Sequence, residues 1–160
     1  MLDIITIFRK IKCRVFRERY IEEYIIQSPK TTTVMSRIAE YALSHSNKVV
    51  LMIIPKFTQY RSFCMRELLK AIPPKEKKRI LEERSSMLYF DNGTRIVCKS
   101  AEVPIKFRGL KADMVVIDDA EIIDFDKLFE ILREIDPRKS CAFLLITGAR
   151  LPIKLRKLDG

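Results

Sequence analysis

Continuous apolar runs at three places predict the buried strands of this chain. Residues 48–55, 114–117 and 141–150 contain such runs, and Pro55 ends the first of them. Uninterrupted apolar runs of this length are typical of strands that are buried on both faces of a parallel sheet. A shorter β-prone run at residues 23–27 predicts a further strand.

Helical periodicity fills the intervals between these runs. Apolar residues recur every three or four positions over residues 31–44, 57–71 and 124–135, which predicts amphipathic helices. Residues 4–20 show the same spacing with one apolar and one basic face. Residues 73–84 open with two prolines and continue with charged residues, so we expect an exposed helix there.

A hairpin is predicted at residues 85–100, where two β-prone runs flank the turn Asp91–Gly93. Buried strands that alternate with helices indicate an α/β domain with a mainly parallel sheet flanked by helices. We therefore expect a basic amphipathic N-terminal helix at 1–21, one α/β domain at 22–150 and a basic tail at 151–160.

Charge adds a candidate partner to this picture. The chain of 160 residues carries a formal charge of +10, which favours polyanions, nucleic acid first. Residues 9–19 hold six basic residues and one acid, whereas residues 113–136 hold nine acids and two bases. The alternative is a solvated surface rich in lysine and arginine. The candidate nucleic-acid contacts are Arg9, Lys10, Lys12, Arg14 and Arg17.

The four cysteines and the single histidine, His45, do not form a metal-binding motif. The cysteines are far apart and include no CxxC pair, so we expect reduced, mostly buried thiols in a cytoplasmic protein. The apolar start is too short to span a bilayer, and its positive charges follow it. We therefore expect no signal peptide and no membrane anchor.

In open α/β sheets, ligands bind beyond the carboxyl ends of the strands, and Asp118 and Asp119 directly follow the run 114–117. Carboxylates at a buried strand end suit magnesium, which proteins hold by one or two carboxylates with waters and substrate phosphates. This assigns Asp118 to binding the metal ion and Asp119 to polarising a water molecule that attacks the bound phosphate. Glu121 is a second candidate for that general base. The alternative is that these acids cap the following segment, with Asp124 as the helix N-cap.

Lys30 and Thr31 stand where a phosphate-binding loop ends, between the predicted strand and helix. In such a loop the lysine reaches the β- and γ-phosphates and the threonine hydroxyl binds magnesium. The two glycines of that motif are absent, because Tyr24 and Pro29 occupy their positions. The alternative is a lysine near the start of a helix.

Taken together, these motifs resemble the ATPase domain of the viral large terminase subunit, a DNA-packaging motor among the P-loop NTPases. The stretch "YFDNGTRIVCKSAEVPIKFRGLKADMVVIDDAEII" carries the resemblance most clearly, and the likeness spans about residues 22–150. It implies a three-layer, RecA-like fold with ATP and Mg²⁺ as cofactors. Its implied partners are double-stranded DNA and either a homo-oligomer or a larger packaging complex.

The resemblance also implies residue roles where the motifs match. Lys30 and Thr31 match the end of Walker A, and Asp118 matches the Walker B aspartate. Asp119 stands where the family usually has glutamate, and Arg108–Gly109 match the loop before Walker B. Thr147 and Gly148 match the coupling motif, which follows Walker B in this family. Together with Gln27 and Ser28, they are the remaining nucleotide contacts that we expect.

Three functions follow from these observations. The first is a magnesium-dependent ATPase module that acts on viral or mobile-element DNA. The second is a catalytically degenerate relative that serves as a DNA-binding or assembly protein, which the missing glycines favour. The third is a magnesium nuclease that uses Asp118, Asp119 and Glu121. No nuclease domain follows residue 150, so we do not expect a complete packaging terminase.

Overall fold

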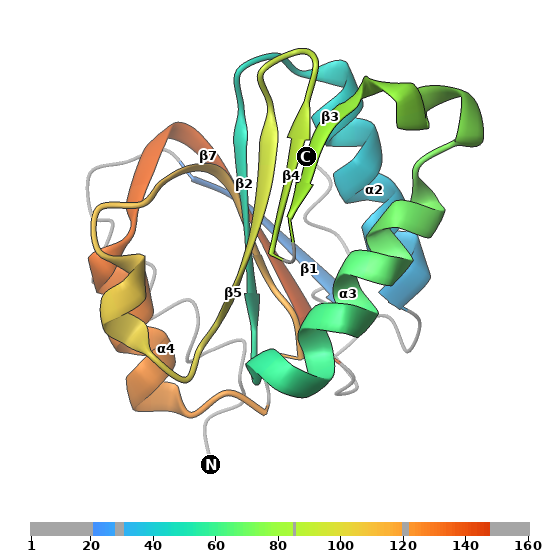
Figure 1. The fold of residues 1–160 in the computed structure, drawn as a ribbon. Coiled ribbons are helices and arrows are strands. Elements are labelled where there is room, and N and C mark those ends of the chain that lie inside the picture. The colour runs from blue at the N-terminus through green and yellow to red at the C-terminus, as the bar shows by residue number, and fades with distance from the viewer. Residues whose placement is uncertain (1–20, 28–30, 85, 120–121, 148–160) are drawn as a thin grey trace.

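The computed structural model describes residues 21–27, 31–84, 86–119 and 122–147, which form a seven-stranded sheet with helices on both faces (Figure 1). The elements, in chain order, are β1 (Ile21–Gln27), α2 (Thr31–Ser44), β2 (Val49–Ile54), α3 (Phe57–Ala71), η1 (Pro74–Arg79), β3 (Ile80–Arg84), β4 (Met87–Phe90), β5 (Arg95–Ser100), η2 (Pro104–Phe107), β6 (Lys111–Ile117), α4 (Phe125–Glu134) and β7 (Asp136–Thr147).

The strand order across the sheet is β1-β7-β6-β2-β5-β4-β3. The first five strands in this order pair in parallel, and β4 is antiparallel to both β5 and β3. Parallel neighbours need long crossover connections, which here contain the helices. The predicted α/β class, with a mainly parallel sheet and a hairpin, is therefore confirmed.

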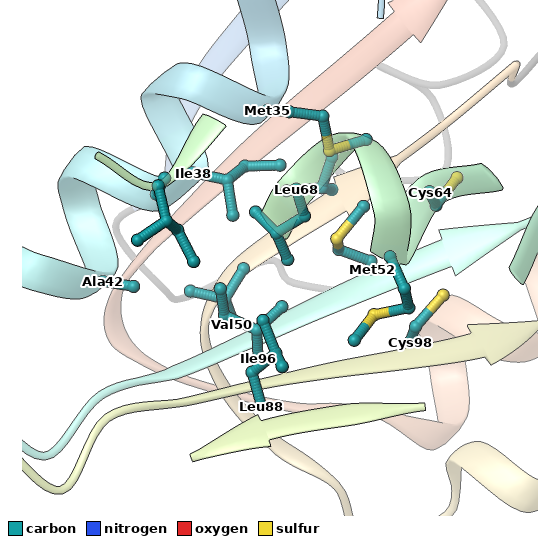
Figure 2. Close-up of a cluster of buried hydrophobic side chains, with 14 of the residues drawn as sticks. Met35, Ile38, Ala42, Val50, Met52, Cys64, Leu68, Leu88, Ile96 and Cys98 are labelled. Atoms are coloured by element: carbon teal, nitrogen blue, oxygen red, sulfur yellow. The ribbon is translucent and has the colours of Figure 1, made fainter. Parts of the chain in front are cut away.

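The molecule has three layers, with α2 and α3 on one face of the sheet and α4 on the other (Figure 1). Along β2, Val50 and Met52 face the α2–α3 side (Figure 2), whereas Leu51 and Ile53 face the α4 side. All six residues of β2 are buried because both of its faces are covered. This explains why the strand is an unbroken apolar run.

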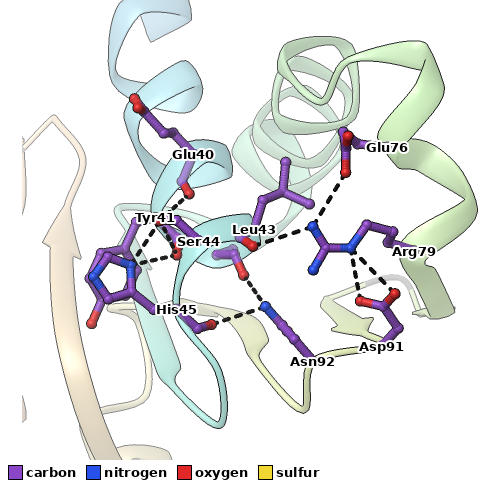
Figure 3. Close-up of polar contacts among 10 residues, drawn as sticks. Glu40, Tyr41, Leu43, Ser44, His45, Glu76, Arg79, Asp91 and Asn92 are labelled. Atoms are coloured by element: carbon purple, nitrogen blue, oxygen red, sulfur yellow. Dashed lines mark hydrogen bonds and ion pairs between the residues drawn. The ribbon is translucent and has the colours of Figure 1, made fainter.

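The β4–β5 turn fastens the end of α2 (Figure 3). The Asn92 side-chain amide donates to the carbonyl oxygens of Ala42 (2.8 Å) and His45 (3.0 Å). Helix ends leave their last carbonyls without partners inside the helix, so the turn supplies these hydrogen bonds. Arg79 forms an ion pair with Asp91 at 3.0 Å and ties the same turn to η1. The predicted hairpin is thus confirmed.

The predicted helix over residues 73–84 is wrong. The chain forms only the short 3₁₀ helix η1 there and then enters the strand β3. Charged residues favour a helix by propensity, but β3 gains its backbone hydrogen bonds by pairing with β4. The Asp91 N–H donates to the Arg79 carbonyl at 2.8 Å, where this pairing begins.

Two predicted strands begin earlier in the structure than in the sequence pattern. β6 starts at Lys111 rather than at residue 114, and β7 starts at Asp136 rather than at residue 141. β1 begins at Ile21, the last residue assigned to the predicted N-terminal helix. The rest of that helix and the predicted tail at 151–160 lie outside the described residues.

Candidate functional site

The carboxyl ends of β1, β7 and β6 meet at one rim of the sheet. Leu145 of β7 pairs with Ile25 of β1 on one side and with Ile117 of β6 on the other. Asp118, the next residue after Ile117, is therefore level with Ile26. Two strand spacings separate these residues, a distance of roughly 10 Å. The strand that precedes Lys30 and the strand that precedes Asp118 thus end at the same rim.

Gln27 and Thr147 are paired at this rim, one residue further along β1 and β7. Both are predicted nucleotide contacts, and the structure places their backbones side by side. Lys30, Ser28 and Gly148 lie outside the described residues, although Lys30 follows Gln27 by only three positions. Thr31 is the first residue of α2.

Asp118 is almost fully buried, with 3% of its surface exposed. Side chains alternate along a strand, so Asp118 shares a sheet face with Met114 and Val116 of β6. Those two residues belong to the core cluster that α2 and α3 cover. The carboxylate of Asp118 therefore lies on the same face of the sheet as the helix that follows Lys30.

Backbone and side-chain hydrogen bonds hold this residue. Its N–H donates to the carbonyl of Ile53 at 2.9 Å. The N–H of Asp119 donates to its Oδ1 at 3.0 Å, and the thiol of Cys64 donates to its Oδ2 at 3.5 Å. Buried carboxylates are costly unless they are paired in this way. The side chain is thus fixed at the rim of the sheet.

Asp119 turns the chain out of β6. It adopts a left-handed backbone conformation with φ of 44°, which is uncommon outside glycine but tolerated by aspartate. Its carbonyl accepts a hydrogen bond from the Ile122 N–H at 2.9 Å. Asp119 is partly exposed at the rim, beside Asp118. Glu121, the other candidate base, lies outside the described residues.

The β1–α2 connection is short. β1 runs through Gln27 and α2 begins at Thr31, which leaves residues 28–30 between them. Tyr24, at the position of the first Walker A glycine, is paired with Leu144 of β7 inside the ladder. The backbone that forms a glycine-rich loop in a full motif is therefore strand here. The part of this segment outside β1 is limited to residues 28–30 and the start of α2.

The start of α2 is suited to an anion. Its first turn contains no acidic residue. The first N–H groups of a helix have no partner within the helix, and the helix dipole is positive at that end. The helix start can therefore contact a phosphate even though β1 replaces the first part of the loop.

A magnesium ion fits this donor set better than a metal held entirely by protein. Among the described residues, no group of three or more His, Cys, Asp or Glu side chains is placed to hold a metal ion. Magnesium usually keeps several waters and needs only one or two carboxylates plus phosphate oxygens. Asp118 supplies such a carboxylate.

Arg108 lies at the opposite rim of the sheet from Asp118. It precedes β6, whereas Asp118 follows that strand, and seven strand residues span roughly 20 Å. Its guanidinium pairs with Glu134 of α4 at 3.0 Å, and the Gly109 N–H donates to the Glu134 carbonyl. The match to the loop before Walker B therefore corresponds to a contact with α4, far from the candidate site.

Cys64 is the site residue that sequence reasoning missed. The sequence indicated a buried, reduced cysteine, and the structure confirms burial for Cys64 and Cys98. Nothing in the spacing of residues shows that α3 brings Cys64 to Asp118, 54 positions away. The basic residues proposed for nucleic acid, at positions 9–17, lie outside the described residues.

Comparisons with known proteins bear on this arrangement. No family model and no curated protein matches the chain. Among solved structures, the large terminase of a thermophilic bacteriophage is similar, with a TM-score of 0.57 and 11% identity over 89% of this chain and 37% of that one. The ATPase domain of the Thermus phage P74-26 large terminase gives a TM-score of 0.53 and 15% identity, over 89% and 65% of the two chains.

The chain has the fold of a terminase ATPase domain. The sequence identities are low, so this likeness concerns the fold alone. The terminase-like chain covers 37% of the length of the first solved structure and 65% of the second. None of the helices in the described residues combines the length and the hydrophobicity that a membrane span requires.

Proposed function

We propose that this chain is a nucleotide-binding, ATP-hydrolysing module that acts on DNA, as part of a viral or mobile-element packaging or translocation system. The observation that carries the proposal is the placement of Asp118. Its buried carboxylate lies at the carboxyl rim of the parallel sheet, on the face covered by α2, in a terminase-like fold. The helix start after Lys30 and this carboxylate thus border the same rim.

Each residue has a role that its chemistry supports. The ammonium of Lys30 would lie against the phosphates, and the hydroxyl of Thr31 with the carboxylate of Asp118 would hold magnesium. A bound magnesium ion neutralises charge that develops on the phosphate oxygens. Asp119 or Glu121 would orient the attacking water and accept its proton. Gln27, Ser28, Thr147 and Gly148 would contact the nucleotide from the neighbouring strand ends.

DNA is the proposed polyanionic partner. The net charge of +10 and the basic run at residues 9–19 support this assignment. The proposed contacts are Arg9, Lys10, Lys12, Arg14 and Arg17. Subunits of the same chain or of a larger packaging complex would complete the assembly.

A degenerate relative is the second candidate function, and the extent of β1 favours it. Residues 24–27 pair with β7 instead of forming a phosphate-binding loop. A protein with this connection would keep the fold and bind DNA without responding to nucleotide. The two proposals differ in whether Mg-ATP stabilises the folded chain.

The test is thermal unfolding of the full chain with and without Mg-ATP. Ligand at a hundred times its Kd stabilises a fold by about 2.7 kcal/mol, a Tm rise of roughly 5–10 °C for a domain of this size. We expect Lys30→Ala and Asp118→Asn to abolish the rise. Phosphate release by the same proteins measures hydrolysis.

Matched controls are available on α3 and α4. Lys70 is exposed in the last turn of α3, and Asp126 is exposed in the first turn of α4. Lys70→Ala and Asp126→Asn should keep the full Tm rise. A wild-type chain that binds DNA but shows no rise with Mg-ATP would support the degenerate relative instead.

A further inference from the structure

The contact between Cys64 and Asp118 joins two parts of the molecule that the proposed mechanism does not otherwise connect. Cys64 belongs to α3, which packs over strands β2 and β5 on one face of the sheet (Figure 2). Its side chain is fully buried, and its Sγ lies 3.5 Å from Asp118 Oδ2. The candidate metal ligand is thus held by a helix to which the proposed mechanism assigns no role.

The thiol is the donor in this contact. Its Sγ lies within hydrogen-bond distance of Asp118 Oδ2, and a cysteine thiol, with an ordinary pKa of about 8.5, is protonated near neutral pH. The sulfur therefore keeps its proton, and an ionised carboxylate oxygen can only accept it in a hydrogen bond. An S–H donor is weak, but the acceptor is charged and buried, where hydrogen bonds are strengthened.

Both oxygens of the carboxylate consequently have a fixed donor. Oδ1 accepts from the Asp119 N–H at 3.0 Å, and Oδ2 accepts from Cys64. The left-handed turn at Asp119 directs that N–H, while the packing of α3 directs the thiol. A carboxylate held on both sides loses rotational freedom before any ligand arrives, which is how partners of metal ligands raise metal affinity.

We propose that Cys64 is a positioning residue, which orients the Asp118 carboxylate for magnesium and couples the placement of α3 to the nucleotide site. This inference rests on the proposed function, because it assigns Asp118 to a magnesium-nucleotide complex. It adds a residue outside the P-loop motifs. Cys64 touches neither metal nor nucleotide in this role.

Cys98 provides the matched control. Like Cys64, it is a buried cysteine outside any disulfide, and it belongs to the same core cluster, on β5 (Figure 2). Cys98→Ala and Cys64→Ala remove the same atoms from the same core. If Cys64 acted only by filling space in the core, Cys64→Val, which fills that space without a donor, would behave like the wild type.

The experiment is a magnesium titration of the ATP-dependent Tm rise, at a fixed ATP concentration, for the full chain and its variants. Removing a partner of a metal ligand typically costs about 10–100-fold in metal affinity, and a thiol is a weak donor. We expect Cys64→Ala to raise the half-maximal magnesium concentration about tenfold. Cys64→Ser, which keeps a donor, should stay within about twofold of wild type.

Cys98→Ala should leave the half-maximal magnesium concentration unchanged, even where it lowers Tm without ligand. Cys64→Val fills the space without a donor, so it should behave like Cys64→Ala and replaces it if the alanine variant does not fold. A wild-type rise with equal magnesium dependence in Cys64→Ala or Cys64→Val would overturn this inference alone. A wild-type chain without any rise would overturn the proposed function and this inference with it.

Discussion

At the scale of single residues, two glycines have left-handed backbone conformations. Replacing each of them separates the cost of backbone strain from the cost of a steric clash with a neighbouring side chain. Gly93 in the β4–β5 turn has φ of 78°, and Gly109 before β6 has φ of 69°. A Cβ on Gly93 would collide with the side-chain oxygen of Asn47, whereas one on Gly109 would meet nothing within 4 Å. The two positions share the backbone strain and differ in the space around them.

We expect Gly109→Ala to destabilise the fold by about 1 kcal/mol, since only the backbone is strained. Gly93→Ala should cost about 1–2 kcal/mol more, because Asn47 must also move. Urea unfolding of both variants measures the difference in the free energy of unfolding. Equal losses in the two variants would show that the Asn47 side chain moves aside without cost.

Single residues also show what the sequence can predict about the site. The sequence predicts that Asp118 lies at the end of a buried strand, because an apolar run there is followed directly by two acids. That signal is local in the sequence. The thiol of Cys64 gives no such signal, since its contact depends on how α3 packs against β6. Arg108 matched a motif, but only the topology shows that it lies at the far rim of the sheet.

At the scale of elements, α4 depends on the cap at its amino end. The Asp124 carboxylate accepts hydrogen bonds from the N–H groups of Asp126 (3.1 Å) and Lys127 (3.2 Å). The loss of an aspartate N-cap typically costs about 1 kcal/mol. Asp124→Ala should therefore lower the free energy of unfolding by about that amount, and Asp124→Asn by much less, as urea unfolding would measure.

Asp126→Ala is the control for this prediction. Asp126 lies in the first turn of α4, where an acid interacts with the helix dipole by roughly 0.3–1 kcal/mol when exposed. Its backbone N–H, which the cap uses, remains in the variant. If Asp124→Ala costs no more than Asp126→Ala, then charge rather than the cap hydrogen bonds stabilises this helix end.

The elements were predicted well where periodicity alone determines them. The ranges 31–44 and 57–71 agree with α2 and α3, because each helix buries one continuous apolar face. Residues 80–84 lack such a signal, since a charged segment becomes the edge strand β3 only through its pairing with β4. The early start of β7 at Asp136 likewise depends on pairing with β6, at Lys111.

At the scale of the whole molecule, the acids and the bases have separate tasks in the proposed function. The acidic segment at residues 113–136 includes Asp118 at the rim and the exposed first turn of α4. The surplus of basic residues is largest at residues 9–19.

The proposed DNA contacts at residues 9–19 can be tested through the salt dependence of DNA binding. Each neutralised phosphate contributes about −0.9 to the slope of log K against log salt, so five contacts contribute roughly −4 to −5. Glutamine at Arg9, Lys10, Lys12, Arg14 and Arg17 should flatten the slope by about that amount. The control carries glutamine at five lysines that are exposed in the described part of the chain, namely Lys70, Lys75, Lys77, Lys78 and Lys106.

Both variants have the same net charge, so a difference between them reports where the DNA lies and not how much charge the protein carries. The control should change the slope by less than about 1, because only contacts that displace counterions from phosphates count. Equal flattening in the two variants would mean that DNA is attracted by the overall charge of the molecule. In that case the run at residues 9–19 acts only as part of a generally basic surface and is not a dedicated DNA-binding segment.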